Sequence, residues 1–216
     1  MIEKNRLSQM KQAIVKGDKE KAQKLARQAV EDDLNLNDVI EEGFVPGIQE
    51  AGNLWEKGEY FLPELITSAE SMKAVMSLFQ PELEKKNLKA KSLGTVIIGT
   101  IEGDIHDIGK NLVASLLSAN GFDVKDLGAD VKISEFIQKA ENEEADFICV
   151  SSLLTTTMLK QKDMIKMLKS KNLYGKFKVL VGGAPVNKKW AQDIGADGYA
   201  ENAMSAAKLA KTLAQK

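Results

Sequence analysis

The apolar positions in the first 88 residues repeat with the period of an α-helix. The clearest example is a seam with steps of three and four residues, formed by Leu65, Ala69, Met72, Met76, Phe79 and Leu83. Such a stripe is typical of a helix that buries one face in a bundle. We therefore expect four helices in this part of the chain, at 3–16, 18–31, 37–57 and 63–86.

Local signals support these boundaries. Pro63 is expected at the first position of its helix, and Asp18 and Asn37 are expected to cap earlier helices. The third helix is unusual because its interior contains residues that weaken helices, which are Gly43, Pro46, Gly47 and Gly52. We expect a kink or unusually close packing there. The segment that follows, 55–63, is richer in aromatic and apolar residues than an ordinary connection.

The pattern changes at the charged segment 84–93, which we interpret as a linker between two domains, 1–88 and 89–216. Beyond it, apolar runs predict strands at 94–100, 122–127, 146–151, 178–182 and 198–200. Helices are expected at 107–120, 133–143, 156–171, 187–194 and 203–214. Strands that are apolar on both faces and separated by helices predict an α/β fold. The expected architecture is a four-helix bundle followed by a doubly wound, parallel, five-stranded sheet of flavodoxin or Rossmann type.

Composition and charge narrow the class of protein. A formal net charge of −1 provides no basic field for nucleic acid or an anionic membrane. No apolar run approaches the length of a membrane span, and the N-terminus lacks a signal-peptide pattern. The only cysteine, Cys149, lies in the third predicted strand without an intramolecular partner, which is typical of a reducing compartment. We therefore expect a cytoplasmic protein without nucleic-acid or membrane partners.

The segments that follow the strands hold the candidate chemistry, because open α/β sheets bind ligands at the carboxyl ends of their strands. His106, the only histidine, follows the first strand, and Asp104 can accept its second ring N–H as in many metal-bound imidazoles. A lone histidine cannot form a tetrahedral zinc site, although a carboxylate-rich site stays possible. A metal that needs one protein ligand is otherwise held by a macrocycle, either haem or a corrin.

Three elements at successive strand ends resemble a known family. These elements are an Asp-x-His-x-x-Gly signature, a Ser-x-Leu element and a Gly-Gly element, present here as Asp104, His106 and Gly109, then Ser151 and Leu153, then Gly182 and Gly183. Their order and spacing resemble the cobalamin-binding module of methionine synthase and the corrinoid proteins of methanol, methylamine and related methyltransferases. The resemblance covers nearly the whole chain, because the four-helix domain also matches.

This resemblance implies a bound cobalamin or related corrinoid in the base-off, histidine-on form. His106 would then be the lower axial ligand of cobalt, while the nucleotide tail of the cofactor enters a slot in the sheet. The other implied cofactor-binding residues are Asp104, Gly109, Ser151, Leu153, Thr155, Gly182, Gly183, Tyr199 and Asn202. Thr157 matches a hydroxyl that extends the His106–Asp104 pair, so Asp104 and Thr157 are the expected catalytic pair. Trp55 and Leu62 would cover the upper face of the corrin.

The same resemblance implies a methyl carrier. Cobalt(I) would accept a methyl group from a substrate-specific methyltransferase, with a methylamine, betaine, methanol or similar donor. A second methyltransferase would pass the group to a thiol or to tetrahydrofolate, and a reductive activase would be a further partner. The run 153–158 slightly favours the methylamine and betaine branch. Because the chain lacks a second site that could activate a methyl donor, we expect a carrier component and not a complete enzyme.

Three other functions use a related architecture. The main alternative is a cobalamin-based sensor or regulatory module, which usually carries an additional effector segment. A binding subunit of a radical isomerase would not need the cover formed by Trp55 and Leu62. A phosphoacceptor receiver domain needs an aspartate at the end of the third strand, where this chain has Ser151 and Ser152.

Overall fold

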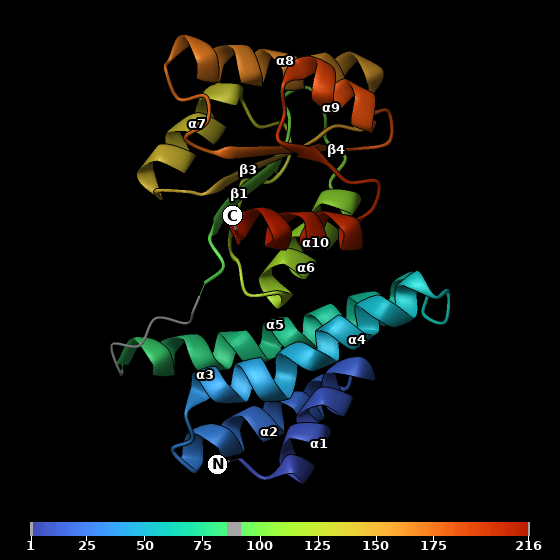
Figure 1. The fold of residues 1–216 in the computed structure, drawn as a ribbon, viewed down its shortest axis with the longest axis vertical. Helices are drawn as coiled ribbons and strands as arrows, with labels where there is room; N and C mark the ends of the chain where they lie inside the picture. Colours follow the sequence, from blue (N-terminus) through green and yellow to red (C-terminus); the bar gives the residue numbers. More distant parts are fainter. Residues whose placement is uncertain (1, 86–91, 216) are drawn as a thin grey trace. The chain divides into compact units, whose positions relative to one another are not determined.

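A computed structural model describes residues 2–85 and 92–215 of the chain (Figure 1). The described residues form two compact units, one with residues 2–85 and one with residues 93–118 and 122–215. The predicted linker, 84–93, lies largely outside the described residues. Domain boundaries at 1–88 and 89–216 therefore stay predictions.

The first unit is helical. In chain order it contains α1 (Lys4–Val15), α2 (Lys19–Glu31), α3 (Leu36–Asp38), the π-helical segment η1 (Val39–Phe44), α4 (Val45–Glu56) and α5 (Leu62–Lys85). Their apolar faces meet in one core, in which Phe44 and Phe79 pack edge to face with ring centres 6.0 Å apart. The predicted seam on α5 lies in this core, with Met76 as its one half-buried member.

The third predicted helix changes its type along its length. It begins as α3, widens into η1 and continues as α4, which has Pro46 in its first turn, where a missing N–H costs least. Glycines let this segment approach α1 closely. A Cβ on Gly43 would lie 2.8 Å from Sδ of Met10, and one on Gly47 would lie 2.6 Å from the carbonyl oxygen of Lys11. The close packing that the composition predicted is therefore present.

One of the two predicted helix caps is confirmed and the other is wrong. The Asp18 carboxylate accepts a hydrogen bond from the backbone N–H of Lys21, at 3.0 Å, as an N-cap does. Asn37 does not cap its helix. The cap is Asn35, which accepts from the backbone N–H of Asn37 at 3.1 Å. The difference arises because the helix begins at Leu36, whose side chain is buried in the core, so that Asn37 already lies inside the first turn.

Strands and helices alternate in the second unit, as predicted. The strands are β1 (Thr95–Thr100), β2 (Asp123–Asp126), β3 (Phe147–Ser151), β4 (Lys178–Gly182) and β5 (Gly198–Tyr199). The helices are α6 (Ile108–Ala119), α7 (Ile133–Asn142), α8 (Thr155–Ser170), α9 (Lys188–Ile194) and α10 (Ala203–Ala214).

The strands form one parallel sheet in the order β2-β1-β3-β4-β5. The chain leaves β1 toward one edge of the sheet and leaves β3 toward the other, so the order reverses between β1 and β3. Helices α7, α8 and α9 cover one face, and α6 and α10 cover the other (Figure 1). The doubly wound fold is thus confirmed, and its reversal point lies beside the predicted His106 segment.

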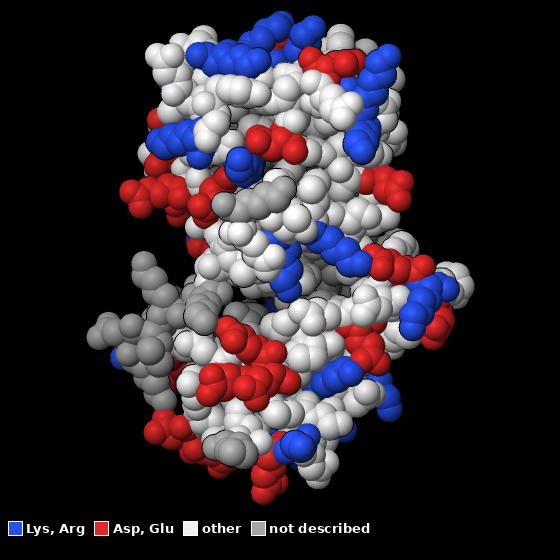
Figure 2. Space-filling view, in the orientation of Figure 1, with Lys and Arg blue, Asp and Glu red and all other residues white. Residues whose placement is uncertain are grey.

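The surface carries charges of both signs. On the face seen in Figure 2, lysine and arginine side chains lie beside aspartate and glutamate side chains on each unit. Within the described residues, no helix combines the length and the apolar content needed to cross a lipid bilayer.

The close contact between α1 and α4 predicts whether Gly47→Ala stabilises or destabilises the protein. Alanine favours a helix over glycine by about 1 kcal/mol, so propensity alone would make Gly47→Ala stabilising. Because its Cβ would overlap Lys11 and Ile14 of α1, we expect a lower free energy of unfolding instead, by about 1–3 kcal/mol. Urea unfolding measures the difference, with Ser77→Ala on the exposed side of α5 as control. A more stable Gly47→Ala protein would contradict the close helix contact.

Candidate functional site

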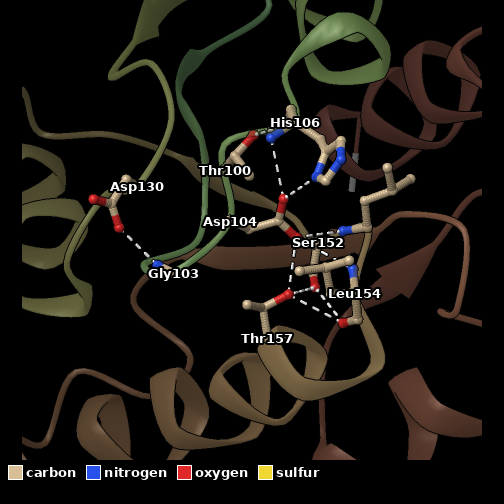
Figure 3. Close-up of polar contacts among 9 residues, drawn as sticks. Thr100, Gly103, Asp104, His106, Asp130, Ser152, Leu154 and Thr157 are labelled. Atoms are coloured by element: carbon tan, nitrogen blue, oxygen red, sulfur yellow. Dashed lines mark hydrogen bonds and ion pairs between the residues drawn. The ribbon is translucent and has the colours of Figure 1, made fainter.

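The segment between β1 and α6 is anchored at His106 and at the residues just before it. The Thr100 hydroxyl, at the end of β1, donates to the carbonyl oxygen of His106 at 2.8 Å. The backbone N–H of Gly103 donates to the Asp130 carboxylate at 2.7 Å, and the N–H of Asp130 donates back to the carbonyl of Asp104 at 2.9 Å. Figure 3 shows these contacts converging on the loop. The backbone that carries His106 is therefore held in place by the sheet and by the segment after β2.

The His106 ring is oriented by Asp104. Nδ1 of His106 lies 2.7 Å from Oδ1 of Asp104, which also accepts the backbone N–H of His106 at 3.1 Å (Figure 3). Because a carboxylate only accepts hydrogen bonds, Nδ1 is the ring nitrogen that donates to Asp104, and the lone pair of a neutral imidazole in this position is on Nε2. The imidazole is half-exposed, and among the described residues none forms a hydrogen bond with Nε2. This nitrogen is therefore free to bind a metal.

The second oxygen of Asp104 is bound by the segment after β3. Oδ2 accepts from the backbone N–H groups of Leu153 and Leu154, at 2.7 and 3.2 Å, and from the Thr157 hydroxyl at 2.8 Å. The carboxylate is completely buried, and burial by itself would raise its pKa. The hydrogen bonds from the His106 ring, the backbone and Thr157 outweigh burial, so the pKa of Asp104 lies well below its usual range. Asp104 is therefore ionised at neutral pH.

The hydroxyl network continues beyond Thr157. The buried Ser152 hydroxyl lies 2.7 Å from Oγ1 of Thr157 and 3.1 Å from the carbonyl oxygen of Leu154 (Figure 3). Thr157 has a single hydrogen to donate, and the ionised Asp104 is its strongest acceptor. The sequence predicted Thr157 in this network but not Ser152, because the contact between Ser152 and Thr157 depends on where α8 begins.

Large apolar side chains surround the half-exposed imidazole. Ile105 is 78% exposed and Ile108 84% exposed, while Leu153 and Leu154 are each about two-fifths exposed. Exposed side chains of this size normally mark a site where another apolar surface binds.

A cavity of about 700 Å³ opens beside His106 in the second unit. Eight of the residues predicted to bind the cofactor line it, namely His106, Gly109, Ser151, Leu153, Gly182, Gly183, Tyr199 and Asn202. Thr155 does not line it, because it is the exposed first residue of α8. Asn202 also caps α10, since its side chain accepts from the N–H of Ser205 at 2.8 Å.

The three predicted glycines differ in what surrounds them. A Cβ on Gly109 would meet nothing within 4 Å, and one on Gly182 would only approach the carbonyl of Ala200, at 4.0 Å. Both positions leave space in the cavity. Gly183 is different, because its φ is +126° and a Cβ there would lie 1.6 Å from the carbonyl oxygen of Ser152. The fold itself therefore requires glycine at 183.

Two buried polar residues near the site were not predicted from the sequence. Lys110 is buried at the start of α6 and donates to both carboxylate oxygens of Asp126, at 2.6 and 2.5 Å. Gln161 of α8 is also buried and donates to the carbonyls of Val150 and Gly182, at 3.0 and 3.2 Å. In the sequence, a buried polar residue of this kind can be recognised as a charged or amide residue among apolar neighbours. The sequence does not reveal which residue it binds.

The helical unit has an exposed apolar cluster of its own. Phe61 is 68% exposed, and Leu62 and Ile66 are 40% and 36% exposed. They lie at the beginning of α5, which follows the connection from Trp55 near the end of α4. Trp55 itself is half-buried. The residues predicted to cover the corrin thus lie on or next to an apolar surface of the first unit.

The side chains around His106 suit a metal that is already held in a macrocycle. Within the described residues, no three histidine, cysteine, aspartate or glutamate side chains form a cluster that could hold a bare metal ion. His106 offers one nitrogen, beside apolar side chains that suit a macrocycle and a cavity that suits a long substituent of that macrocycle. The residues present therefore fit a corrinoid.

Comparisons with known proteins agree with this geometry. A family described as "B12 binding domain" matches residues 94–208, and a second family with the same description matches residues 6–80. A corrinoid protein of Desulfitobacterium hafniense is 47% identical over 96% of this chain and 96% of its own length. Trimethylamine corrinoid protein 2 of Methanosarcina acetivorans is 46% identical over 93% of this chain and 92% of its own.

A solved structure extends the likeness to three dimensions. The methanol:cobalamin methyltransferase complex of Methanosarcina barkeri contains a chain with a TM-score of 0.86 and 30% identity, covering 99% of this chain and 81% of that one. Family matches to both units and relatives of full length lead to one conclusion. The chain belongs to the corrinoid proteins, a family with B12-binding domains.

Proposed function

We propose that this protein carries methyl groups between two methyltransferases on a corrinoid bound in the base-off, histidine-on form. The observation that carries the proposal is the orientation of His106, whose Nδ1 is bound to Asp104 and whose Nε2 lies free among exposed apolar side chains. When bound, the corrinoid would supply a cobalt that accepts and releases the methyl group. The protein supplies the axial nitrogen, the apolar platform and the exclusion of water.

Asp104 and Thr157 tune the axial nitrogen in this proposal. The hydrogen bond from Nδ1 to the ionised Asp104 makes Nε2 a better electron donor, as in other metal-bound imidazoles that donate to a carboxylate. Thr157 and the backbone of Leu153 and Leu154 hold part of the same negative charge. Gly109 would leave room for the corrin ring, while Gly182 and the cavity would accommodate the nucleotide tail, with Ser151 and Asn202 on the cavity wall beside it. Thr155, outside the cavity, would reach the tail only if the start of α8 moved.

Trp55 and Leu62 form the cover of the upper face in this proposal. The apolar side chains Phe61, Leu62 and Ile66 of the helical unit need a partner surface, and an apolar corrin edge would provide one. A cover that excludes water must open for each methyltransferase. The segment 84–93 is the proposed hinge, and it lies largely outside the described residues.

The names of the relatives support the carrier role and a methylamine donor. Similar curated proteins include trimethylamine and dimethylamine corrinoid proteins, while one similar solved structure comes from a methanol system. We propose a methylated amine as donor, a thiol or tetrahydrofolate as acceptor, and a reductive activase that restores cobalt(I). A cobalamin sensor would bind the same cofactor without passing the methyl group on.

The identity of the axial ligand can be tested by electron paramagnetic resonance of the cob(II)alamin-loaded protein. An axial nitrogen splits each cobalt line into a triplet, and ¹⁵N changes the triplet into a doublet. Labelling the protein with ¹⁵N-histidine should therefore produce doublets, because His106 is the only histidine. In His106→Ala the labelled-protein splitting should vanish. Triplets that persist after labelling would show that the cofactor's own base remains on cobalt.

The space at Gly109 predicts opposite effects on stability and on binding. Because a Cβ would meet no protein atom, Gly109→Ala should leave the cofactor-free protein unchanged or stabilise it by up to about 1 kcal/mol. The same methyl group would meet the bound corrinoid, so the dissociation constant should rise by about tenfold or more. Leu159→Ala is a suitable control, because the Leu159 side chain is exposed on α8. Gly128→Ala is not suitable, because the positive φ of Gly128 would strain an alanine. Undiminished corrinoid affinity in Gly109→Ala would place the ring elsewhere.

Methyl transfer itself can be followed by the visible spectrum of the reduced, cobalamin-loaded protein. Adding trimethylamine with its methyltransferase should convert the spectrum to the methylated form, and a second methyltransferase with its acceptor should reverse it. Chemical cross-linking of the two units should stop both steps without releasing the cofactor. Methylation that cannot be reversed by any acceptor enzyme would favour a sensor, and transfer that survives cross-linking would contradict a moving cover.

A further inference from the structure

The deep end of the cavity is formed by one row of apolar residues across the sheet. Ile98 pairs with Cys149, and Cys149 pairs with Leu180, so their side chains lie on the same face of neighbouring strands. Leu117 of α6 and Leu209 of α10 line the cavity beside this row. The Leu180 and Leu209 side chains meet above Gly198, where a Cβ would lie 3.1 and 2.6 Å from them. We call the three residues Ile98, Cys149 and Leu180 the floor.

The floor is neutral as well as apolar. Burial raises the pKa of the Cys149 thiol to about 12, so it stays protonated at physiological pH. A protonated thiol is at most a weak hydrogen-bond donor. Within the described part of the chain, the floor thus offers a ligand no strong hydrogen-bonding side chain.

On the central strands, polar residues begin one row nearer to the mouth of the cavity. At the side of the floor, the buried Lys110 also lines the cavity. Its ammonium is already bound by Asn111 and by Asp126, the neighbour of Ile98 in the sheet. Two residues further along the strands, the same face carries Ser151 paired with Gly182. The Ser151 hydroxyl lines the cavity and has no hydrogen-bond partner among the described residues. Glu201 and Asn202, after β5, also lie on the cavity wall. The cavity therefore changes from polar at its mouth to apolar at its floor.

From this gradient we infer that the cavity selects corrinoids by the outer edge of their lower base, and that it favours a hydrocarbon edge over a purine. The inference rests on the proposed base-off form, in which the base enters the cavity at the end of the polar nucleotide tail. The dimethyl edge of 5,6-dimethylbenzimidazole would bury methyl groups on Ile98, Cys149 and Leu180. An adenine base would place ring nitrogens and an amine there without partners. A buried polar group without a partner typically costs enough to weaken binding about tenfold.

Cys149→Ser tests this selectivity with the smallest change available, because it replaces the thiol with a hydroxyl that both donates and accepts. Three probes are titrated into the full-length protein in one cobalt oxidation state: cobalamin, the adenine-containing cobamide, and cobinamide, which has no base. Each affinity is corrected for the base-on to base-off equilibrium of the free cofactor. Cys149→Ala is the matched control, because it removes the thiol without adding a polar group.

We expect the wild-type protein and Cys149→Ala to bind cobalamin about tenfold more tightly than the adenine cobamide after correction. Cys149→Ser should reduce this preference several-fold. Equal corrected affinities in the wild type, or a preference that Cys149→Ser leaves unchanged, would overturn the inference. If none of the three probes binds, the proposed function fails as well. If they bind with the ¹⁵N-histidine signature but without selectivity, only the inference on the base fails.

Discussion

The site depends on a single buried carboxylate shared by two segments of the chain. Asp104 belongs to the loop after β1, yet three of its hydrogen-bond donors come from the connection after β3 and from the first turn of α8. A buried charge is costly unless it is fully hydrogen-bonded, so these donors hold the two segments together at the reversal point of the sheet. The same carboxylate fixes the tautomer and direction of the His106 ring. One carboxylate therefore both links two segments of the chain and orients the His106 ring.

Most of the fold could be predicted because its elements are strongly periodic. Runs such as 94–100 and 146–151 are apolar on both faces, which distinguishes buried parallel strands, and all five strands occur where the sequence predicted them. The sequence pattern was least informative where two possible helix starts differ by only two residues. Asn35 and Asn37 are both competent caps, and the burial of Leu36 decides between them. The glycines of the third predicted helix indicated close packing, and Gly43 does lie against Met10 of α1, but the π-helical form of η1 was not predicted.

The site could be predicted only in part. Short motifs at strand ends placed His106, Ser151 and Gly182 around one cavity, since parallel strands bring their carboxyl ends together. Residues that act through a partner were missed, because pairs such as Lys110 with Asp126 are 16 positions apart and meet only after folding. Thr155 shows the opposite limit. Thr155 is the first residue of α8 and does not line the cavity, although Leu153, two residues earlier, does.

The three donors on Oδ2 of Asp104 also moderate what this carboxylate does to the imidazole. They lie at the N-terminal end of α8, where the helix dipole is positive, and they draw negative charge away from the His106 side. A carboxylate without these donors would pull harder on the Nδ1 proton and make Nε2 a stronger base. The ligand field that this chain offers is therefore of intermediate strength. In the proposed carrier, an axial nitrogen of intermediate donor strength would suit a bond to cobalt that breaks and forms again during methyl transfer.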